Sequence, residues 1–150
     1  MGTASTYSDV LQFVTFKLVE QKYAVDILKV QEIENIREIT TIPHAPAYLE
    51  GAINLRGKVI PVINLRKKFG FGDYEDRQRS KIIILVIGGA VMGVMVDSVS
   101  DVIRISCEVV EPAPSVSSNE SSHFITGIAN LAEGLVILLD VDKLLTEVKH

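Results

Sequence analysis

The chain has 150 residues, of which 47% are hydrophobic, and its formal net charge is -4. These values fit one ordinary domain, or two very small ones, with a well-filled core. The negative charge argues against a molecule built to bind polyanions. The single cysteine, Cys107, excludes an intrachain disulfide and favours a reducing compartment.

No stretch of the sequence is typical of a targeting or membrane-spanning segment. Residues 1–9 are small and polar, without the basic and apolar regions of a signal peptide. The longest uncharged run, 82–96, is shorter than the ~20 residues that a spanning helix needs. Gly88-Gly89 at its centre favours a hairpin instead. We therefore expect a soluble, cytoplasmic protein with no direct membrane insertion.

The first half of the chain predicts short strands and a capped terminal helix. β-branched and alternating apolar residues indicate strands at 10–19, 23–27, 36–39, 52–55 and 59–63. Ile27, Val30 and Ile33 stand three apart, as on one face of a short helix. The last two strands form a hairpin with Arg56 at its turn, and Asn64 caps the helix that follows.

The second half repeats this pattern after a polar, glycine-bearing segment. Strands are predicted at 82–87, 91–96, 102–110, 125–131 and 135–139. Asp97 is expected to cap a short turn, and Asp140 to cap a final helix. The apolar triplet of the first half recurs as Val96, Val99 and Val102 at a constant offset. This recurrence indicates an internal repeat.

The repeat predicts a mainly β fold of two subdomains with short helices. Five strands with frequent turns favour a small barrel that closes to hide its edges. Because each half is marginal for an independent core, we expect two five-stranded barrels packed intimately over shared apolar surface. The expected limits are 10–70 for the first subdomain, 81–140 for the second and 140–149 for a C-terminal helix, all within a single domain, 1–150.

No motif points to catalysis, a metal or a cofactor. The segment 51–58 lacks the spacing of a phosphate-binding loop. The three histidines are scattered, and none stands at metal-ligand spacing from Cys107. A helix cap and a solvated carboxylate account for Asp140 and Asp142. No glycine-framed serine nucleophile is present. We therefore expect a non-catalytic protein.

Two other classes of function remain open at this point. Basic residues gather between Arg56 and Lys81, and five-stranded barrels include oligonucleotide-binding folds. Against a nucleic-acid partner, aromatic residues are only 6% of the chain and tryptophan is absent, so platforms for base stacking are scarce. A solvated surface is the simpler explanation of these basic residues. A small hydrolase has no candidate nucleophile–base pair.

Several motifs in order resemble the CheW family of bacterial chemotaxis coupling proteins. They are the segment 23–33, the sequence Asn54-Leu55-Arg56-Gly57 followed by Val-Ile-Pro-Val, and a short basic helix after it. The resemblance continues to a final helix near Val148 and covers nearly the whole chain. It implies paired SH3-like barrels. It also implies an adaptor that couples transmembrane chemoreceptors to the histidine kinase CheA.

The resemblance implies two partner surfaces. The cytoplasmic tip of a methyl-accepting chemoreceptor is expected to meet Ile27, Val30, Glu32, Ile33, Arg56, Val96 and Val99. The regulatory domain of CheA is expected to meet Ile39, Ile42, Pro43 and Tyr48 on the first barrel and Val116 on the second. Inter-barrel core is the alternative for all five apolar receptor residues, Ile27 and Val96 above all. An inward loop anchor is the alternative for Val116, and a cover over the barrel end for the four first-barrel kinase residues, above all Tyr48. The protein would be recruited to membrane-associated receptor arrays as a stand-alone coupler.

Overall fold

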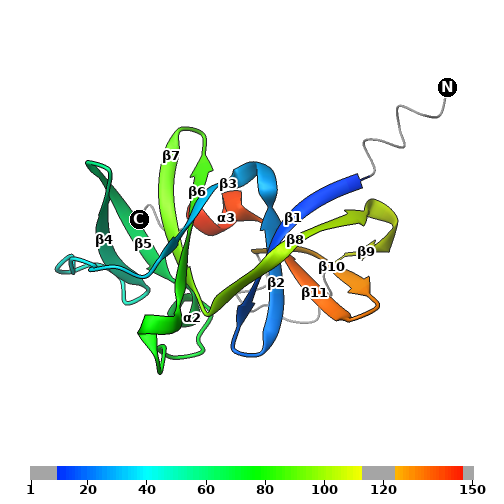
Figure 1. Ribbon diagram of the computed structural model, residues 1–150, viewed down its shortest axis with the longest axis horizontal. Coiled ribbons are helices and arrows are strands. Elements are labelled where there is room, and N and C mark those ends of the chain that lie inside the picture. Colours follow the sequence, from blue (N-terminus) through cyan, green and yellow to red (C-terminus); the bar gives the residue numbers. More distant parts are fainter. Residues whose placement is uncertain (1–9, 113–123, 147–150) are drawn as a thin grey trace.

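The protein folds into two curved β-sheets side by side, which we call barrel A and barrel B (Figure 1). The computed structural model describes residues 10–112 and 124–146. Within this part, barrel A contains β1 (Val10–Leu18), β2 (Gln21–Asp26), β8 (Ser98–Ser106), β9 (Val110–Glu111), β10 (Ile125–Leu131) and β11 (Gly134–Leu139). Barrel B contains β3 (Val30–Asn35), β4 (Leu49–Leu55), β5 (Lys58–Asn64), β6 (Lys81–Ile87) and β7 (Ala90–Val96). The helices are η1 (Ile27–Lys29), α2 (Leu65–Lys68), η2 (Arg77–Arg79), η3 (Cys107–Val109) and α3 (Val141–Thr146).

Apart from the short edge strand β9, which only barrel A has among the described residues, the two barrels share one strand arrangement. Barrel A runs β8-β1-β2-β11-β10-β9, and barrel B runs β3-β6-β7-β5-β4. Neighbouring strands are antiparallel, except that β2 pairs with β11, and β7 with β5, in parallel. These parallel pairs occupy the same position in the two sheets. The predicted fold class, a mainly β protein of two packed barrels with short helices, is confirmed.

The two halves of the chain exchange hairpins. β1 and β2, from the first half, complete barrel A, whose other strands lie within 98–139. β6 and β7, from the second half, complete barrel B beside β3, β4 and β5. The predicted subdomain limits of 10–70 and 81–140 are therefore corrected. Barrel B is the continuous segment 30–96, and barrel A is built from the chain on either side of it.

The strand pattern agrees with the predicted repeat even though the barrels do not follow its boundary. Each half contains a hairpin, an edge strand, a second hairpin and a helix, ending in α2 or α3. Both helices begin at the expected caps: Asn64 Oδ1 accepts from the Lys67 amide at 3.2 Å, and Asp140 Oδ1 from the Lys143 amide at 3.1 Å. Because the first hairpins of the two halves are equivalent, local sequence does not decide which barrel each one completes.

Three local predictions differ from the structure. The expected helix from Ile27 to Ile33 shrinks to η1, and Val30 begins β3, since pairing with β6 supplies the main-chain hydrogen bonds. The expected strand at 36–39 is irregular, with a single bridge that follows it at Thr40. The turn expected after Asp97 is instead the long strand β8, which pairs with β1. In each case tertiary pairing overrides local spacing.

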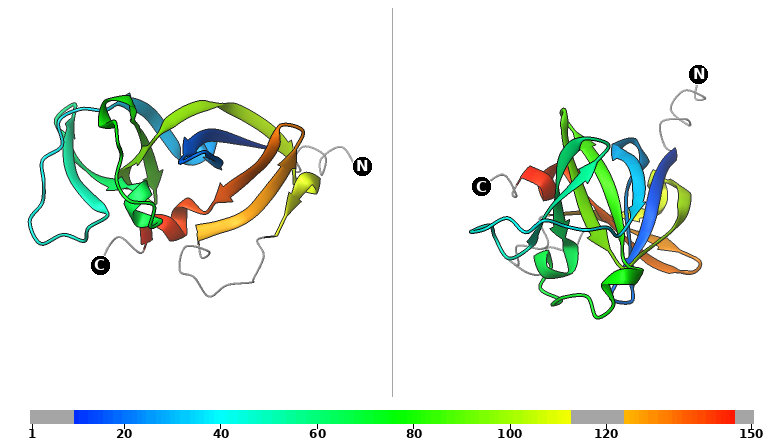
Figure 2. Two further views of the ribbon diagram at one scale, coloured as in Figure 1. Left: turned by 90° about the horizontal axis from the view of Figure 1, so that it is seen from below. Right: turned by 60° about the vertical axis from the view of Figure 1, so that its left-hand side comes forward.

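The larger core lies between the barrels and joins them. Phe16, Leu18 and Tyr23 of barrel A are buried with residues of β5, β6 and β7. Val141 and Leu144 of α3 join this core, so the helix that follows barrel A packs against barrel B, as the left view of Figure 2 shows. A smaller core fills barrel A and comprises Phe13, Ala24, Ile105, Ala129, Val136 and Leu138. The expected sharing of apolar surface is therefore present.

A close backbone contact helps to close barrel B at β4. Thr40 and Ala52 exchange two main-chain hydrogen bonds of 2.8 Å, which bring the loop after β3 onto β4. Gly51 lies against this bridge with a φ of +150, and a Cβ there would stand 2.1 Å from the carbonyl oxygen of Thr40. Only glycine fits this position, because any side chain would displace the backbone of the loop.

Candidate interaction surfaces

Two predicted site residues meet at the seam where the edges of barrel B approach each other. Arg56, in the β4–β5 turn, donates to the carboxylate of Glu32 on β3, and the two form an ion pair. The turn places Arg56 at a φ of 51 and is held by a 2.9 Å bond from the Gly57 amide to Asn54 Oδ1. The sequence thus presents a cation on a tight turn at the rim of the barrel.

Electrostatics at this seam stabilise the charged forms. The hydrogen bond from Arg56 is the largest cause that lowers the pKa of Glu32, to about 2. Gln31 adds a hydrogen bond of 3.1 Å to the same carboxylate. Next to this pair, Arg37 binds Glu34 and donates to the carbonyl oxygen of Asn54 at 3.3 Å. Side-chain pairs therefore connect β3 to the β4–β5 hairpin.

The other predicted receptor residues divide into accessible and buried groups. Ile27, Val30 and Val99 are half-buried against the core between the barrels, and Ile33 is 44% exposed. Val96 is 0% exposed and belongs to the inter-barrel core. The prediction that it contacts a receptor is therefore wrong. Its burial follows from its place at the end of β7, inside the shared core.

Two further exposed apolar residues, one in η1 and one in β8, were not predicted as site residues. Leu28 of η1 is 86% exposed, because Asp26 caps the short helix by accepting from the Leu28 amide at 2.9 Å and turns that side chain outward. Val102 of β8 is 49% exposed. Val102 matches Ile33 in the internal repeat, and this correspondence is the sequence feature from which its exposure could have been predicted.

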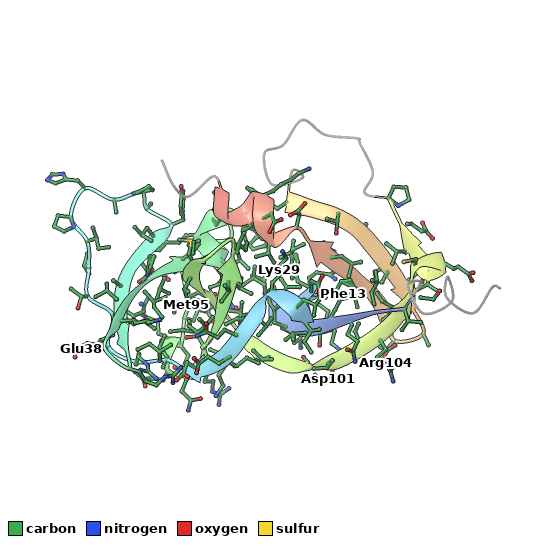
Figure 3. All side chains as sticks on the ribbon, turned by 90° about the horizontal axis from the view of Figure 1, so that it is seen from above. Phe13, Lys29, Glu38, Met95, Asp101 and Arg104 are labelled. Atoms are coloured by element: carbon green, nitrogen blue, oxygen red, sulfur yellow. The ribbon has the colours of Figure 1, made fainter. Side chains whose placement is uncertain are left out.

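The predicted kinase residues of the first barrel lie on the loop between β3 and β4. Ile42 and Pro43 are exposed, whereas Ile39 and Tyr48 are half-buried against the core. The ammonium group of Lys68 lies 4.2 Å from the centre of the Tyr48 ring. In Figure 3, Glu38 marks this end of barrel B, Met95 lies within the same lobe and Lys29 lies at the junction with barrel A. Val116 falls outside the described residues.

The basic stretch that kept a nucleic-acid partner open is largely paired with carboxylates. The ion pairs are Arg56–Glu32, Arg66–Asp97, Lys67–Glu50, Lys67–Asp73, Arg77–Glu50, Arg77–Asp73 and Arg79–Asp76. Lys81 donates to Asn35, and Lys68 lies over aromatic rings. A polyanion would have to displace these internal carboxylates, so the arrangement does not favour a phosphate-binding face.

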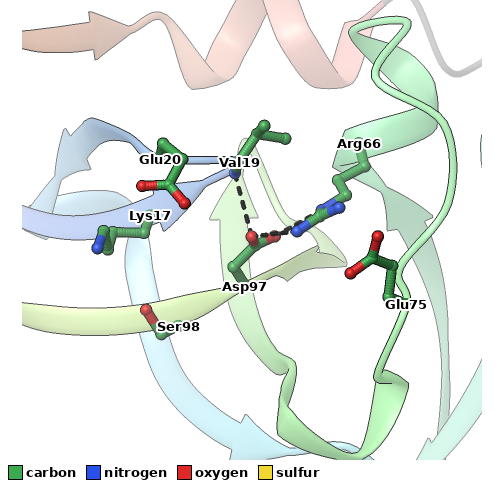
Figure 4. Close-up of a pocket in the computed structure, with 7 residues that line it drawn as sticks. All are labelled: Lys17, Val19, Glu20, Arg66, Glu75, Asp97 and Ser98. Atoms are coloured by element: carbon green, nitrogen blue, oxygen red, sulfur yellow. Dashed lines mark hydrogen bonds and ion pairs between the residues drawn. The ribbon is translucent and has the colours of Figure 1, made fainter.

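A polar pocket lies where α2, the β1–β2 turn and the β7–β8 junction meet, lined by Lys17, Val19, Glu20, Arg66, Glu75, Asp97 and Ser98 (Figure 4). The hydrogen bond from Arg66 to Asp97 raises the pKa of the arginine. Burial raises the pKa of Tyr74, which lies beneath Arg66 and is fixed as a neutral phenol. Two cationic side chains, Lys17 and Arg66, and three acidic side chains, Glu20, Glu75 and Asp97, line the pocket.

Some chemical features are not found in the part of the chain that the structure describes. No group of histidine, cysteine and acidic side chains there is arranged to hold a metal ion. Across residues 10–112 and 124–146, no helix is long and apolar enough to cross a membrane. Every buried side-chain nitrogen or oxygen of the described residues has a hydrogen-bond partner.

The fold and these surfaces define a class: a paired-barrel interaction module. A family model, the CheW-like domain, matches residues 12–149. Chemotaxis protein CheW of Klebsiella aerogenes is 38% identical over 135 residues, which are 90% of this chain and 81% of that protein. Chemotaxis protein CheW of Treponema pallidum is 36% identical over 137 residues, covering 89% and 81% of the two chains. The chain belongs to the CheW-like family.

A solved structure agrees with this assignment. The crystal structure of the scaffolding protein TtCheW from Thermoanaerobacter tengcongensis superposes with a TM-score of 0.79 at 41% identity. The superposition covers 86% of this chain and 88% of that one. Sequence and fold therefore identify the same family over the same length.

Proposed function

We propose that this protein is a non-catalytic adaptor that couples transmembrane chemoreceptors to the histidine kinase CheA in bacterial chemotaxis arrays. The observation that carries the proposal is the CheW-like match over residues 12–149. Relatives that match most of the chain are named chemotaxis proteins, and the similar structure is named a scaffolding protein. In this role the protein works in the cytoplasm and reaches the membrane only through its receptors.

The receptor surface of this adaptor is the edge of the inter-barrel core together with the seam. Val30 and Ile33 supply apolar contacts from barrel B, and Val99 supplies one from barrel A, with Ile27 beside them. A receptor tip is an antiparallel helix pair, and such helices bind with an apolar stripe against apolar side chains. The Glu32–Arg56 pair then lies beside the apolar contacts, where Arg56 can donate to a receptor or kinase acceptor.

The kinase surface is the exposed loop at the far end of barrel B. Ile42 and Pro43 form its accessible apolar part, and Ile39 and Tyr48 support them from below. Val116, outside the described residues, is the proposed second kinase contact. Since the receptor and kinase surfaces use different residues, one molecule can hold both partners at once. Coupling then arises because the binding of one partner changes the equilibrium of the other.

Titration of a purified receptor cytoplasmic fragment tests the receptor surface directly. Val30→Asp places an unpaired charge against an apolar partner. It should therefore weaken binding by ~2 kcal/mol or more, a tenfold or larger drop in affinity. The matched control is Leu135→Asp, because Leu135 is an exposed apolar strand residue of barrel A outside either surface. A folded Val30→Asp protein with the parent's affinity removes this surface from the proposal.

The kinase surface has a parallel test with immobilised CheA. Ile42→Asp should reduce the amount of CheA captured and leave the melting temperature unchanged, because the side chain is exposed. The experiment is run at two salt concentrations to separate apolar from charged contacts. Unchanged capture by a normally folded Ile42→Asp protein contradicts this assignment.

A further inference from the structure

Three segments drawn from both barrels meet at Asp97, where the chain passes from β7 to β8. In barrel A, the Asp97 amide donates to the Lys17 carbonyl at 3.1 Å, and Asp97 Oδ2 accepts from the Val19 amide at 3.1 Å. In barrel B, Arg66 of α2 donates from Nε to Asp97 Oδ1 at 2.9 Å and from Nη2 to the other oxygen. Figure 4 shows Asp97 between Val19 and Arg66. One carboxylate therefore binds both barrels.

The turn that Asp97 holds is conformationally unfavourable. Val19 and Glu20, between β1 and β2, have φ angles of 62 and 116, in a region that side chains other than glycine rarely adopt. A β-branched residue such as Val19 is especially uncommon there. Such a backbone persists only when its surroundings determine it. The bond from the Val19 amide to Asp97 is one of the contacts that hold the turn.

Arg66 is itself held in place within barrel B. It lies in the first turn of α2, directly after β5, and its guanidinium carbon is 4.8 Å from the centre of the Tyr74 ring. Tyr74 is buried, and its hydroxyl donates to the carbonyl oxygen of Met95 on β7. The arginine is therefore fixed against the end of β7 before it reaches Asp97.

We propose that the Arg66–Asp97 pair is a positioning device that sets the orientation of barrel A relative to barrel B, and with it the geometry between the two partner surfaces. The second half of this inference rests on the proposed function. The receptor surface draws on both barrels, through Val30 and Val99, whereas the exposed kinase loop lies on barrel B alone. A change of orientation would therefore shift the barrel A part of the receptor surface relative to the kinase loop, and with it the geometry between the two partners.

Spin-label distances in the full chain test the orientation without any partner. Labels are placed at Lys58→Cys, an exposed position at the start of β5 in barrel B, and at Glu133→Cys, an exposed position in the β10–β11 turn of barrel A, in a Cys107→Ser background. The parent should give one narrow distance distribution by double electron–electron resonance. Arg66→Ala should give a broader or displaced distribution, since the bidentate link is lost. A distribution unchanged from the parent overturns the proposal.

Two further variants separate the positioning role from general stability. Arg79→Ala removes an exposed pair with Asp76 that stays within one loop, and it should leave the distance distribution unchanged. Arg66→Lys keeps the charge but lacks the planar fork that matches both carboxylate oxygens. It should give an intermediate distribution, and it also carries the test if Arg66→Ala does not fold. An Arg79→Ala distribution as broad as that of Arg66→Ala overturns the specific role of the pair.

Reconstituted complexes with receptor fragments and CheA test the consequence for signalling. Arg66→Ala should bind CheA through the exposed loop of barrel B with the parent's affinity, whereas receptor affinity should fall, because Val30 and Val99 lie on different barrels. At saturating receptor, receptor control of kinase activity should fall about fivefold or more. Full receptor control in a folded Arg66→Ala protein overturns the signalling role. If the parent binds neither partner, the proposed function fails together with that role, while the spin-label distances still decide whether the pair orients the barrels.

Discussion

Two arginine–carboxylate pairs flank the strand β5, and they differ in what surrounds them. Arg56 precedes β5 and pairs with Glu32 at the seam of barrel B, where the arginine side chain is 66% exposed. Arg66 follows β5 and pairs with Asp97 at the barrel junction, where the two side chains are 19% and 23% exposed. Only the second pair also binds a backbone amide, that of Val19.

The comparison shows how the fold gives different roles to one chemistry. An ion pair in contact with solvent is screened by salt and contributes little to stability, so its arginine remains able to bind an incoming carboxylate or carbonyl. A sheltered pair with additional hydrogen bonds contributes more, since removing one partner leaves polar groups unsatisfied. We therefore assign the seam pair to binding and the junction pair to architecture. The following variants test that assignment.

The largest effect is expected at the seam, from its backbone rather than its ion pair. Gly51→Ala forces a Cβ against the Thr40 carbonyl and should lower the free energy of unfolding by about 3 kcal/mol. The control is Gly57→Ala, which also has a positive φ but meets no atom within 4 Å, and it should cost only about 1 kcal/mol. Urea unfolding measures both values. Equal effects in the two variants would show that the Thr40 contact is not what requires glycine.

The second effect is expected at the junction. Asp97→Ala leaves the Val19 amide and Arg66 without their acceptor, and it should lower the free energy of unfolding by about 2 kcal/mol. Asp76→Ala, which breaks an exposed pair with Arg79, should cost under about 0.5 kcal/mol. Chemical unfolding of both variants measures the two free energies. If Asp97→Ala is as stable as Asp76→Ala, the two kinds of pair are energetically alike and the comparison fails.

A smaller effect on stability is expected for the seam pair itself. Arg56→Ala should change the free energy of unfolding less than Asp97→Ala does, because the arginine side chain is exposed and the pair is screened by solvent. Receptor titration over a range of salt concentrations should nevertheless show weaker binding with a reduced salt dependence, since a charged rim contact is gone. Parent-like binding at every salt concentration would limit Arg56 to a structural role.

The smallest effect is a pH dependence of stability from Glu32. Its pKa is lowered to about 2 in the folded protein, chiefly by the hydrogen bond from Arg56. A carboxyl group with a lowered folded pKa contributes stability above its unfolded pKa, and this contribution is lost as the pH falls through the folded value. Parent and Glu32→Gln should therefore differ most above pH ~4.5 and converge towards pH ~2. Thermal melts across this range measure the difference, and a constant offset would exclude Glu32 as its source.

Local features of the fold were predictable because neighbouring residues decide them. The hairpin around Arg56 was expected from apolar runs flanking a glycine-bearing turn, and the structure has β4 and β5 there. The caps at Asn64 and Asp140 were expected from residue type, and both accept the predicted amide bonds. The pairing of Glu32 with Arg56 was not expected, because 24 positions separate the two residues and only barrel closure brings them together.

Residues with mixed signals needed the tertiary structure. Val30 and Ile33 have helical spacing, but as β-branched residues they also favour strands. They form a strand because β6 offers main-chain groups with which β3 pairs. Val96 and Val99 belong to the same apolar triplet of the repeat, yet Val96 is fully buried at the end of β7 and Val99 is half-buried in β8. Side-chain burial at these positions depends on which hairpin packs beside them.

The sequence by itself determined the hairpins, the helix caps, the internal repeat and the family, since all of these depend on residue type and order along short stretches. Tertiary structure alone decided that the halves exchange hairpins, that barrel B is an uninterrupted segment between two parts of barrel A, and that Asp97 binds both barrels. The physical reason is the repeat. Equivalent hairpins have nearly equal local preferences, so the choice between barrels is made by long-range packing over the shared core.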